Sequence, residues 1–425
     1  MDLTRRHLLG GFAATAAATV LPARLLLAKA PIERRFVLII LRGALDGLAA
    51  MPPYADPDLR ALRGALLPPD PGGDGGMVDL DGRFALHPGL APLKYWYAEG
   101  GFLPLHAVAS PYRDRSHFDG QDLLETGAAR LDGTRDGWLN RTLGLIGATD
   151  RRFGIAFAEE IPLVLRGATP VTSWLPDKPA GLPPGFPDLV ARLYDRDPAL
   201  HAAYAAGLDT TAFGRQIQGM VQADTAMTAG PAQGAMAQGA MAQGAMAGGA
   251  MAGAAAGADL QLAEAAGRFL ADPGGSRIAV MELYGWDTHV QQVKRLDRLL
   301  AGYAATLQAL RRGLGDAWKQ TAILTVTEFG RTAAANGSGG TDHGTGSVAF
   351  LAGGAVHGGR VLADWPGLAQ DKLYQGRDLA PTTDLRAVVK GVFRDHLGLP
   401  EDALDRIVFP GSADAAPMRE LVRRA

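Results

Sequence analysis

The chain has 425 residues, of which 47% are hydrophobic and 20% charged, with 56 glycines and a formal net charge of −2. This composition predicts a globular protein with a large core and many tight turns, and the near-neutral charge excludes a basic field for nucleic acid. The chain has no cysteine. Disulfides, zinc–thiolate sites, cysteine nucleophiles and formylglycine made from cysteine are therefore excluded, and any metal must be held by histidine and carboxylate ligands.

Residues 1–30 have the layout of a twin-arginine export signal. Arg5 and Arg6 precede a mildly apolar, alanine-rich run over residues 11–20, and small residues follow. The alternative is a basic N-terminal helix. The apolar run is too short for a permanent membrane span, so we expect the twin-arginine translocase to export the protein to the periplasm or beyond. Residues 31–425 then form one mature domain.

The first strand is predicted over residues 36–41, which are continuously apolar, as in a strand covered on both faces. It runs directly into Arg42, a candidate substrate-binding residue, and Asp46. Ligands of open α/β sheets bind beyond the carboxyl ends of the strands, which favours Asp46 as a metal ligand. A helix cap or turn explains the same residue equally simply.

Residues 49–101 are rich in proline and glycine and predict long loops, with a helix over 90–97 and a second strand over 102–108. The polar loop that follows this strand is a candidate catalytic segment. Ser116 would supply a hydroxyl nucleophile and His117 a proton carrier or metal ligand.

Two arginines of the same loop, Arg113 and Arg115, are candidates to clamp a substrate anion. The alternative makes Ser116 the N-cap of a helix, with Asp119 completing a capping box. Both interpretations stay open, because one serine can serve both purposes.

The middle of the chain is less informative. Short strands are predicted over 153–157 and 162–165, and a helix over 182–204. Residues 232–258 repeat Gln-Gly-Ala-Met-Ala with variation, and their frequent glycines predict a flexible surface insert rather than a helix.

Further elements resume at residue 260, with a helix over 260–270 and a strand over 277–283. Asp287 and His289 follow this strand and form an O,N pair of the kind that zinc or manganese accepts. The alternative is an N-cap at Asp287 or Thr288 for the predicted helix 291–314, which leaves His289 unexplained.

Polar residues also separate two strands predicted over 321–327 and 347–352. Glu328, Asp342 and His343 are candidate metal ligands there, and Arg331 either binds a substrate anion or pairs with Glu328. The last predicted helix, 382–397, is expected to expose Arg394 and His396.

Several acidic and histidine side chains thus follow the ends of predicted strands. Their convergence on one sheet edge would cost too much repulsion and desolvation unless cations compensated it, which indicates a two-metal cluster. Two cations would clamp the attacking and leaving oxygens of a phosphate-type ester.

The twin-arginine start and the polar motifs together resemble domain-of-unknown-function family 1501, which is grouped with the alkaline phosphatase and sulfatase superfamily. The resemblance rests on residues 41–47, 116–119, 285–289, 328–332 and 340–344. It implies an alkaline phosphatase-like, three-layer α/β/α fold with a mostly parallel central sheet. It also implies one or two divalent metal ions, such as zinc, manganese, magnesium or calcium.

Carried over by motif, the resemblance implies Asp46, Asp287, His289 and His343 as metal ligands. Glu328 occupies the strand end where superfamily members usually have Asp-His, and Phe329 replaces the expected histidine. Ser116 is implied as the nucleophile by its order in the chain. A formylglycine sulfatase is not expected, because the sequence lacks the sulfatase signature.

The predicted function is an exported metal-dependent hydrolase of phosphate or sulfate esters. It would act on small-molecule or glycan esters, with Ser116 or a metal-bound water as nucleophile and His117 transferring a proton. The alternative is a non-catalytic periplasmic binding or assembly protein that retains the fold.

Overall fold

The computed structural model describes residues 32–175, 186–194, 196–198, 200–202, 204–205, 207–208 and 249–423. The predicted export signal, residues 1–30, and residues 232–248 of the predicted insert lie outside this part of the chain. Among the helices of the described residues, none combines the length and apolar character needed to cross a membrane.

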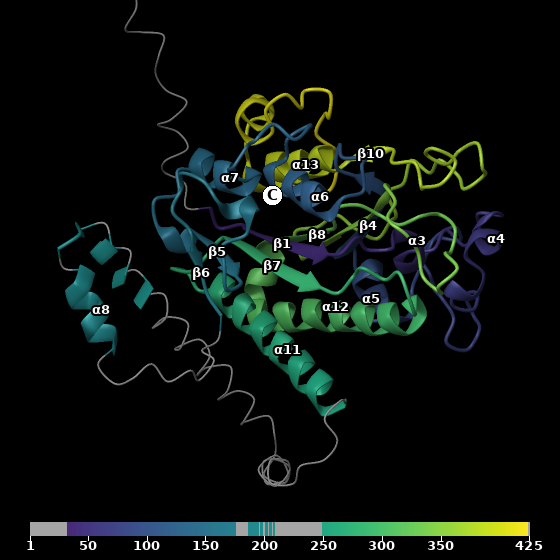
Figure 1. Ribbon diagram of the computed structural model, residues 1–425, viewed down its shortest axis with the longest axis horizontal. Coiled ribbons are helices and arrows are strands. Elements are labelled where there is room, and N and C mark those ends of the chain that lie inside the picture. The colour runs from purple at the N-terminus through teal and green to yellow at the C-terminus, as the bar shows by residue number, and fades with distance from the viewer. Residues whose placement is uncertain are drawn as a thin grey trace, which may run out of the picture.

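An eight-stranded sheet forms the centre of the structure (Figure 1). β9 is antiparallel to both of its neighbours, whereas the other strand pairs of this sheet are parallel. The predicted α/β class with a mostly parallel sheet is confirmed. In spatial order the strands are β10 (Thr383–Asp384), β4 (Phe102–Ala109), β9 (Ser347–Ala352), β8 (Thr321–Val326), β1 (Arg35–Arg42), β7 (Ile278–Tyr284), β5 (Gly154–Phe157) and β6 (Thr172–Ser173).

Helices cover both faces of this sheet (Figure 1). α5, α11 and α12 pack on one face, and α6, α7 and α13 on the other. The helices are α3 (Gly47–Ala50), α4 (Leu59–Arg63), α5 (Leu93–Ala98), α6 (His117–Thr126), α7 (Trp138–Ile146), α8 (Phe186–Tyr194), α11 (Gly249–Ala271), α12 (Gln292–Leu314), α13 (Leu385–Leu397) and α14 (Glu401–Ala403). A small hairpin, β2 (Val78–Asp79) and β3 (Ala85–Leu86), lies in the long loop before α5.

β1 shows why an uninterrupted apolar run was needed at the centre of the sheet. Its side chains alternate between two cores: Val37 and Leu41 pack on the α12 side, and Phe36 and Ile40 on the α13 side. All eight residues of the strand are buried. The strand carries charged side chains only at its two terminal residues, Arg35 and Arg42, and the candidate site lies just beyond the second of them.

Three predicted elements are wrong in type or placement. The strand expected over 162–165 is a turn of 3-10 helix at Leu163–Leu165. Helix α11 begins at Gly249, so the last ten residues of the predicted flexible insert are helical. His396 is buried and its Nε2 lies 2.9 Å from the carbonyl oxygen of Arg35, contrary to its predicted exposure. In the first case the buried Val164 and Leu165 pack into the core, so tertiary packing overrides local composition.

Two buried histidines make the free energy of unfolding depend on pH. Burial lowers the pKa of His396 from 6.5 to about 4 and that of His106 to about 3. Between these values and 6.5 the unfolded chain binds protons that the native state does not. Stability is therefore lost as the pH falls from about 6.5 through this window, by about 2 kcal/mol per histidine between pH 7 and pH 5.

We expect His396→Gln to reduce this loss by about 2 kcal/mol, because the amide keeps a donor for the Arg35 carbonyl but does not titrate. Urea unfolding at pH 7 and pH 5 measures the difference. His357→Gln, at an exposed position, is the control and should leave the loss unchanged. An equal loss in wild type and His396→Gln would contradict the prediction.

Candidate metal site

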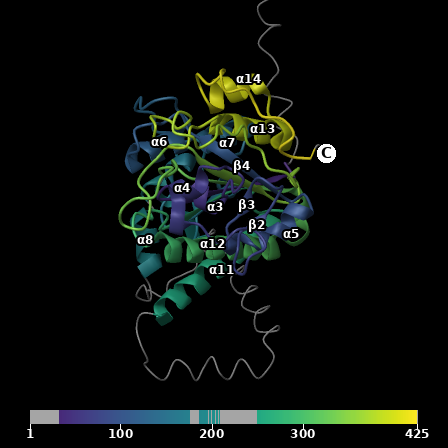
Figure 2. The ribbon, with the colours of Figure 1, turned by 90° about the vertical axis from the view of Figure 1, so that its right-hand side faces the viewer.

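The candidate site lies at one edge of the sheet, beyond the carboxyl ends of the parallel strands. In Figure 1 the arrows of β1 and β7 point toward this edge, and Figure 2 looks onto it, with α3 and α4 in front. Asp287 and His289 follow β7, His117 is the first residue of α6 beyond β4, and His343 lies between β8 and β9. Segments far apart in sequence thus contribute to one cluster.

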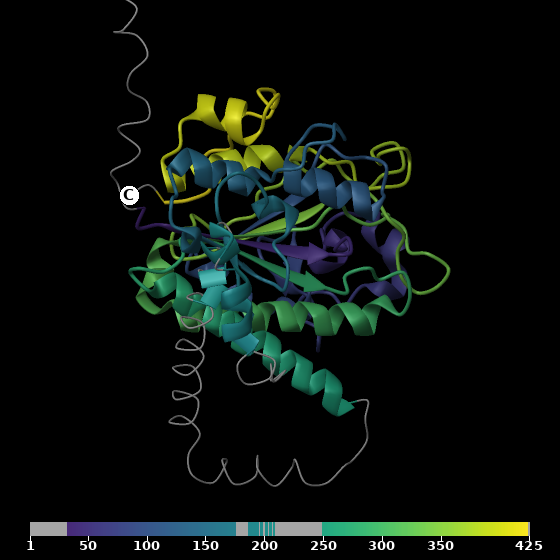
Figure 3. The ribbon, with the colours of Figure 1, turned by 60° about the vertical axis from the view of Figure 1, so that its left-hand side comes forward.

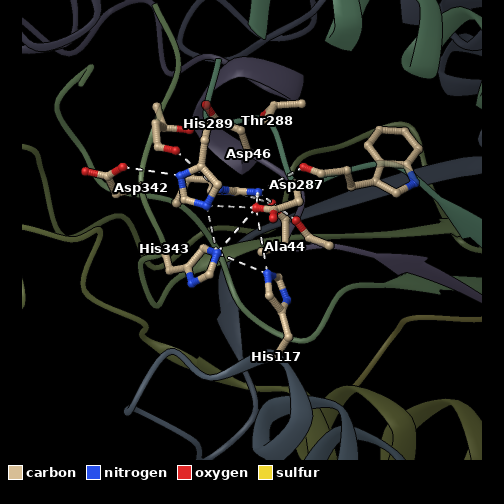
Figure 4. A network of polar contacts seen from close by, with 12 residues as sticks. Ala44, Asp46, His117, Asp287, Thr288, His289, Asp342 and His343 are labelled. Carbon is tan, nitrogen blue, oxygen red and sulfur yellow. Dashed lines mark hydrogen bonds and ion pairs between the residues drawn. The ribbon is translucent and has the colours of Figure 1, made fainter. Parts of the chain in front are cut away.

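Three imidazoles and one carboxylate converge on a single point (Figure 4). Nε2 of His343 lies 3.0 Å from Nε2 of His117 and 3.0 Å from Nε2 of His289. Oδ1 of Asp287 lies 3.0 Å from the His289 nitrogen, 3.3 Å from that of His343 and 3.7 Å from that of His117. Ligands arranged tetrahedrally at roughly 2.0–2.1 Å from a zinc ion are about 3.3 Å apart. His117, Asp287 and His343 therefore fit one divalent cation, and Nε2 of His289 lies 3.0 Å from the donor atoms of the last two.

The outer ring nitrogens support this assignment. Each Nδ1 faces an oxygen acceptor: His117 faces Glu328 Oε1 at 2.8 Å, His289 faces Asp342 Oδ1 at 3.3 Å, and His343 faces the Arg115 carbonyl at 3.0 Å. These partners favour a proton on each Nδ1 and orient each Nε2 toward the centre, where it can bind a cation. The hydrogen bond to Glu328 also raises the pKa of His117. Lone pairs about 3 Å apart repel unless a cation or proton lies between them, and oxygen partners on the outer nitrogen are typical of metal-binding histidines.

Glu328 and Asp342, predicted as metal ligands, instead contact the outer ring nitrogens of His117 and His289. Glu328 is 1% exposed and also accepts a hydrogen bond from Gly43 N at 2.9 Å. Burial raises its pKa, but the hydrogen bonds from His117 and backbone N–H groups outweigh burial and hold the pKa below its ordinary value. Asp342 accepts from Asn336 as well as His289, and these bonds lower its pKa in the same way. Both carboxylates orient an imidazole.

Asp46, also predicted as a ligand, is paired with an arginine instead. Its Oδ2 accepts hydrogen bonds from Arg63 and, at 2.6 Å, from Gln292, and its Oδ1 caps α3 through Ala49 N. Arg63 is buried and also donates to the carbonyl of Ala333 at 2.7 Å. The guanidinium supplies the counter-charge that the sequence analysis assigned to a metal ion.

Arg331 does not face a substrate, contrary to one of the two predicted roles. Its side chain has no exposed surface and bonds Asp287 rather than Glu328. Although burial raises the pKa of Asp287, the hydrogen bond and charge of Arg331 lower it overall. Its other donors reach the backbone carbonyls of Ala44, Gly43, Trp286 and Thr341.

The predicted anion clamp of Arg113 and Arg115 is also used within the protein. Arg113 donates to backbone carbonyls, including that of Tyr112 at 2.6 Å. Arg115 pairs with Asp378 at 2.7 Å and has a left-handed backbone, with φ of 63°. This conformation, uncommon in a non-glycine residue, aims its carbonyl oxygen at His343.

An open hollow of about 360 Å³ lies directly beside the ligands. Arg42 reaches it but is shared with two carboxylates, Glu125 and Glu282, at 2.7 Å each. Its Nη1 has no hydrogen-bond partner among the described residues. The hollow is lined by Arg42, Gly43, His117, Gln121, Glu282, Tyr284 and Asp287.

The structure separates the two predicted catalytic residues. His117 faces the other ligands with Nε2 and Glu328 with Nδ1, so both ring nitrogens are engaged and neither is free to exchange a proton with a substrate. Ser116 is the N-cap residue of α6, yet its side chain makes no capping hydrogen bond, and Asp119 contacts Tyr112 instead. The predicted N-cap position of Ser116 is confirmed, but the capping box does not form, and the nucleophile role stays a prediction.

Several hydrogen-bond partners of the predicted site residues were not recognisable from the sequence. Arg63, Gln292, Glu125, Glu282 and Asp378 each bond a predicted site residue. Their sequence neighbourhoods carry no motif. The one available signal was the position of Glu282 at the end of a predicted strand.

Fold and site together define an α/β protein with a histidine–carboxylate cluster beyond its strand ends. A family model described as "Protein of unknown function (DUF1501)" matches residues 107–408, which is more than half of the chain. The protein belongs to this family.

A search of curated proteins found no match. Among solved structures, the chain is similar to the crystal structure of the C-terminal periplasmic domain of EcEptC from Escherichia coli, complex with Zn. The identity is 11%, over 89% of this chain and 87% of that chain, with a TM-score of 0.35. This TM-score is too low to define the fold.

Substitution of a ligand and substitution of an outer partner should have different effects on metal binding. We expect wild type to bind one equivalent of zinc or manganese, and His343→Ala to lose it. Glu328→Gln should keep full stoichiometry at saturating metal but bind about 10–100-fold more weakly, because it only orients His117. Elemental analysis and competition with a chelator measure both quantities.

Asp74→Asn, at an exposed loop position, is the control and should match wild type. Full metal content in His343→Ala, or none in wild type purified without chelator, would contradict the assignment.

A second prediction concerns Asp46. We expect Asp46→Asn to retain the metal but lose about 3–5 kcal/mol of unfolding free energy, because Arg63 is left buried without its counter-charge. Urea unfolding and elemental analysis test the two halves. Asp70→Asn removes the matching exposed pair with Arg60 and should cost about 1 kcal/mol or less. Loss of metal in Asp46→Asn would restore Asp46 as a ligand.

Proposed function

We propose that this protein is an exported metal-dependent hydrolase of phosphate or sulfate esters. The observation that carries the proposal is the convergence of three imidazole Nε2 atoms and the Asp287 carboxylate beside an open hollow. A purely structural cluster would have no need of unprotonated nitrogens facing one another next to solvent. Export to the periplasm rests on the sequence of residues 1–30.

The donor set favours zinc or manganese over magnesium or calcium, which prefer oxygen ligands. A divalent cation bound there would act as a Lewis acid toward a phosphoryl or sulfuryl oxygen. His117, His289, His343 and Asp287 would hold it.

One cation, rather than the predicted two, accords with the surrounding charges. Asp46, expected at a two-metal cluster, is bonded to the buried guanidinium of Arg63, and Glu328 and Asp342 bond the outer nitrogens of histidines. Phe329, in place of the expected histidine, packs its ring 4.9 Å from that of His117. These side chains leave four ligands for a single ion.

The residues around the hollow supply the remaining functions. Arg42 and Gln121 line the hollow and would flank an anionic ester bound there. The amide nitrogen of Gln121 also donates to Glu328 at 3.3 Å. Ser116 precedes the ligand His117. Its hydroxyl oxygen, or that of a water molecule, forms the new bond to phosphorus or sulfur and gives its proton to solvent, while the bond to the ester oxygen breaks and that oxygen takes up a proton from solvent. Where Ser116 attacks, a water molecule then hydrolyses the phosphorylated or sulfated serine and restores the hydroxyl.

The alternative is a non-catalytic binding protein that retains the metal. Phe329 favours it, because an aromatic ring stands where a further ligand is expected and walls the imidazoles on one side. The hollow beside Arg42 favours the enzyme. The two functions predict different behaviour of metal-loaded wild type.

We expect metal-loaded wild type to hydrolyse aryl phosphate or sulfate esters, and Ser116→Ala to lose about 100-fold or more in kcat while keeping its metal. Release of the aryl alcohol gives the rate. Ser338→Ala, at an exposed loop position, is the control. Inactive wild type with full metal occupancy would support the binding protein, and unchanged activity in Ser116→Ala would leave water as the nucleophile.

A further inference from the structure

A second hollow, of about 740 Å³, lies between α11 and α12. The reaction proposed above gives it no role. This volume is in the range of small-molecule sites, roughly 300–1,000 Å³. Most of its walls are apolar. It is lined by Asp259, Leu260, Leu283, Tyr284, Gly285, Trp286, Arg295, Arg298, Leu299, Ala301, Gly302, Tyr303, Ala305 and Thr306, and we call it the helix groove.

The helix groove follows from how the two helices cross. At Gly267 a Cβ would lie 2.4 Å from the carbonyl oxygen of Leu310, and at Gly313 it would lie 2.1 Å from that of Glu264. Glycine therefore allows backbone contact at the crossing. From there the N-terminal part of α11 diverges from α12 (Figure 3). The groove opens between the diverging segments.

The helix groove adjoins the candidate metal site. Trp286 lines the groove, and the next residue, Asp287, is a candidate ligand. Tyr284 lines both the groove and the hollow beside the ligands. Trp286 is 1% exposed, and its indole nitrogen has no hydrogen-bond partner within the described part of the chain. The two hollows therefore adjoin at Tyr284.

Exposed apolar side chains flank the same ligands. Phe118 follows His117 and is 85% exposed, and Val290 follows His289 and is also exposed. Tyr284 is exposed at the boundary of the two hollows. Apolar groups rimming a polar centre mark a binding surface for a ligand that has both characters.

We propose that the substrate is an amphiphilic ester, with its phosphate or sulfate group at the metal site and one alkyl or aryl chain in the helix groove. This inference rests on the proposed function. A single chain is the occupant because the groove has the volume of a small-molecule site. At Tyr284 the groove adjoins the hollow beside the metal ligands. Its apolar walls contribute binding free energy in proportion to the chain buried.

The test uses n-alkylphosphonates from ethyl to decyl, below the concentrations at which they form micelles. Calorimetric titration of the metal-loaded wild type gives Kd for each. We expect Kd to fall by up to about fourfold per added methylene until the groove is filled. Because these ligands cannot be hydrolysed, the readout does not depend on turnover.

Gly302→Trp is the matched variant. A Cβ at Gly302 has no heavy atom within 4 Å, so the indole fills the groove without disturbing α12. We expect this variant to bind ethylphosphonate as wild type does and to lose the dependence on chain length. Lys294→Trp places the same bulk at an exposed position of α12 outside the groove and should keep the dependence.

The outcomes are distinguishable. If every phosphonate binds wild type with the same Kd, the groove does not hold the chain and the inference is wrong, while the metal site stands. If Gly302→Trp keeps the chain-length dependence, the chain binds elsewhere and the inference is also wrong. If no phosphonate binds metal-loaded protein, the proposed function fails and the inference fails with it.

Discussion

The site depends on one buried guanidinium, that of Arg331. Its donors reach the carbonyl of Ala44 at 2.7 Å, that of Trp286 at 3.1 Å and that of Thr341 at 3.2 Å, and it also bonds Asp287. These groups belong to the loops after β1, after β7 and between β8 and β9. Because a planar guanidinium presents several donors in fixed directions, it holds three loops in one arrangement. The ligands on two of these loops take their positions from it.

Two other buried arginines follow the same principle. Arg63 neutralises Asp46, and Arg42 is shared between Glu125 and Glu282. Removing one partner from such a group leaves a buried charge uncompensated, so each group is kept as a unit. This charge balance changes the interpretation of the acidic residues. Both oxygens of Asp46 already accept hydrogen bonds, so Asp46 has none left for a metal ion. Asp287 pairs with Arg331 but still faces the imidazoles.

The helices connect the two hollows to the sheet. α12 begins two residues after Val290, and its buried Gln292 donates to Asp46, so the start of the helix is tied to the loop after β1. The same helix forms a wall of the helix groove further along. A rigid sheet with both faces covered fixes these elements relative to one another, which allows a polar centre and an apolar groove to adjoin at one edge.

The sequence by itself determined the sheet and its polar edge. Continuous apolar runs identified β1, β4, β7, β8 and β9 within a residue or two, because a strand buried on both faces admits few other residue types. The same runs located Asp287, His289 and His343 beyond strand ends, since polar side chains are excluded from the strands themselves.

Only the tertiary structure decided which polar residues face one another. Glu328 and Asp342 are carboxylates of the loop after β8, just as Asp287 is a carboxylate of the loop after β7, yet they bond the outer nitrogens of histidines. Asp46 was assigned to a metal because its partner Arg63 lies in an unpatterned segment 17 positions away. Hydrogen-bond partners and counter-charges are set by three-dimensional proximity, and linear spacing does not record that proximity.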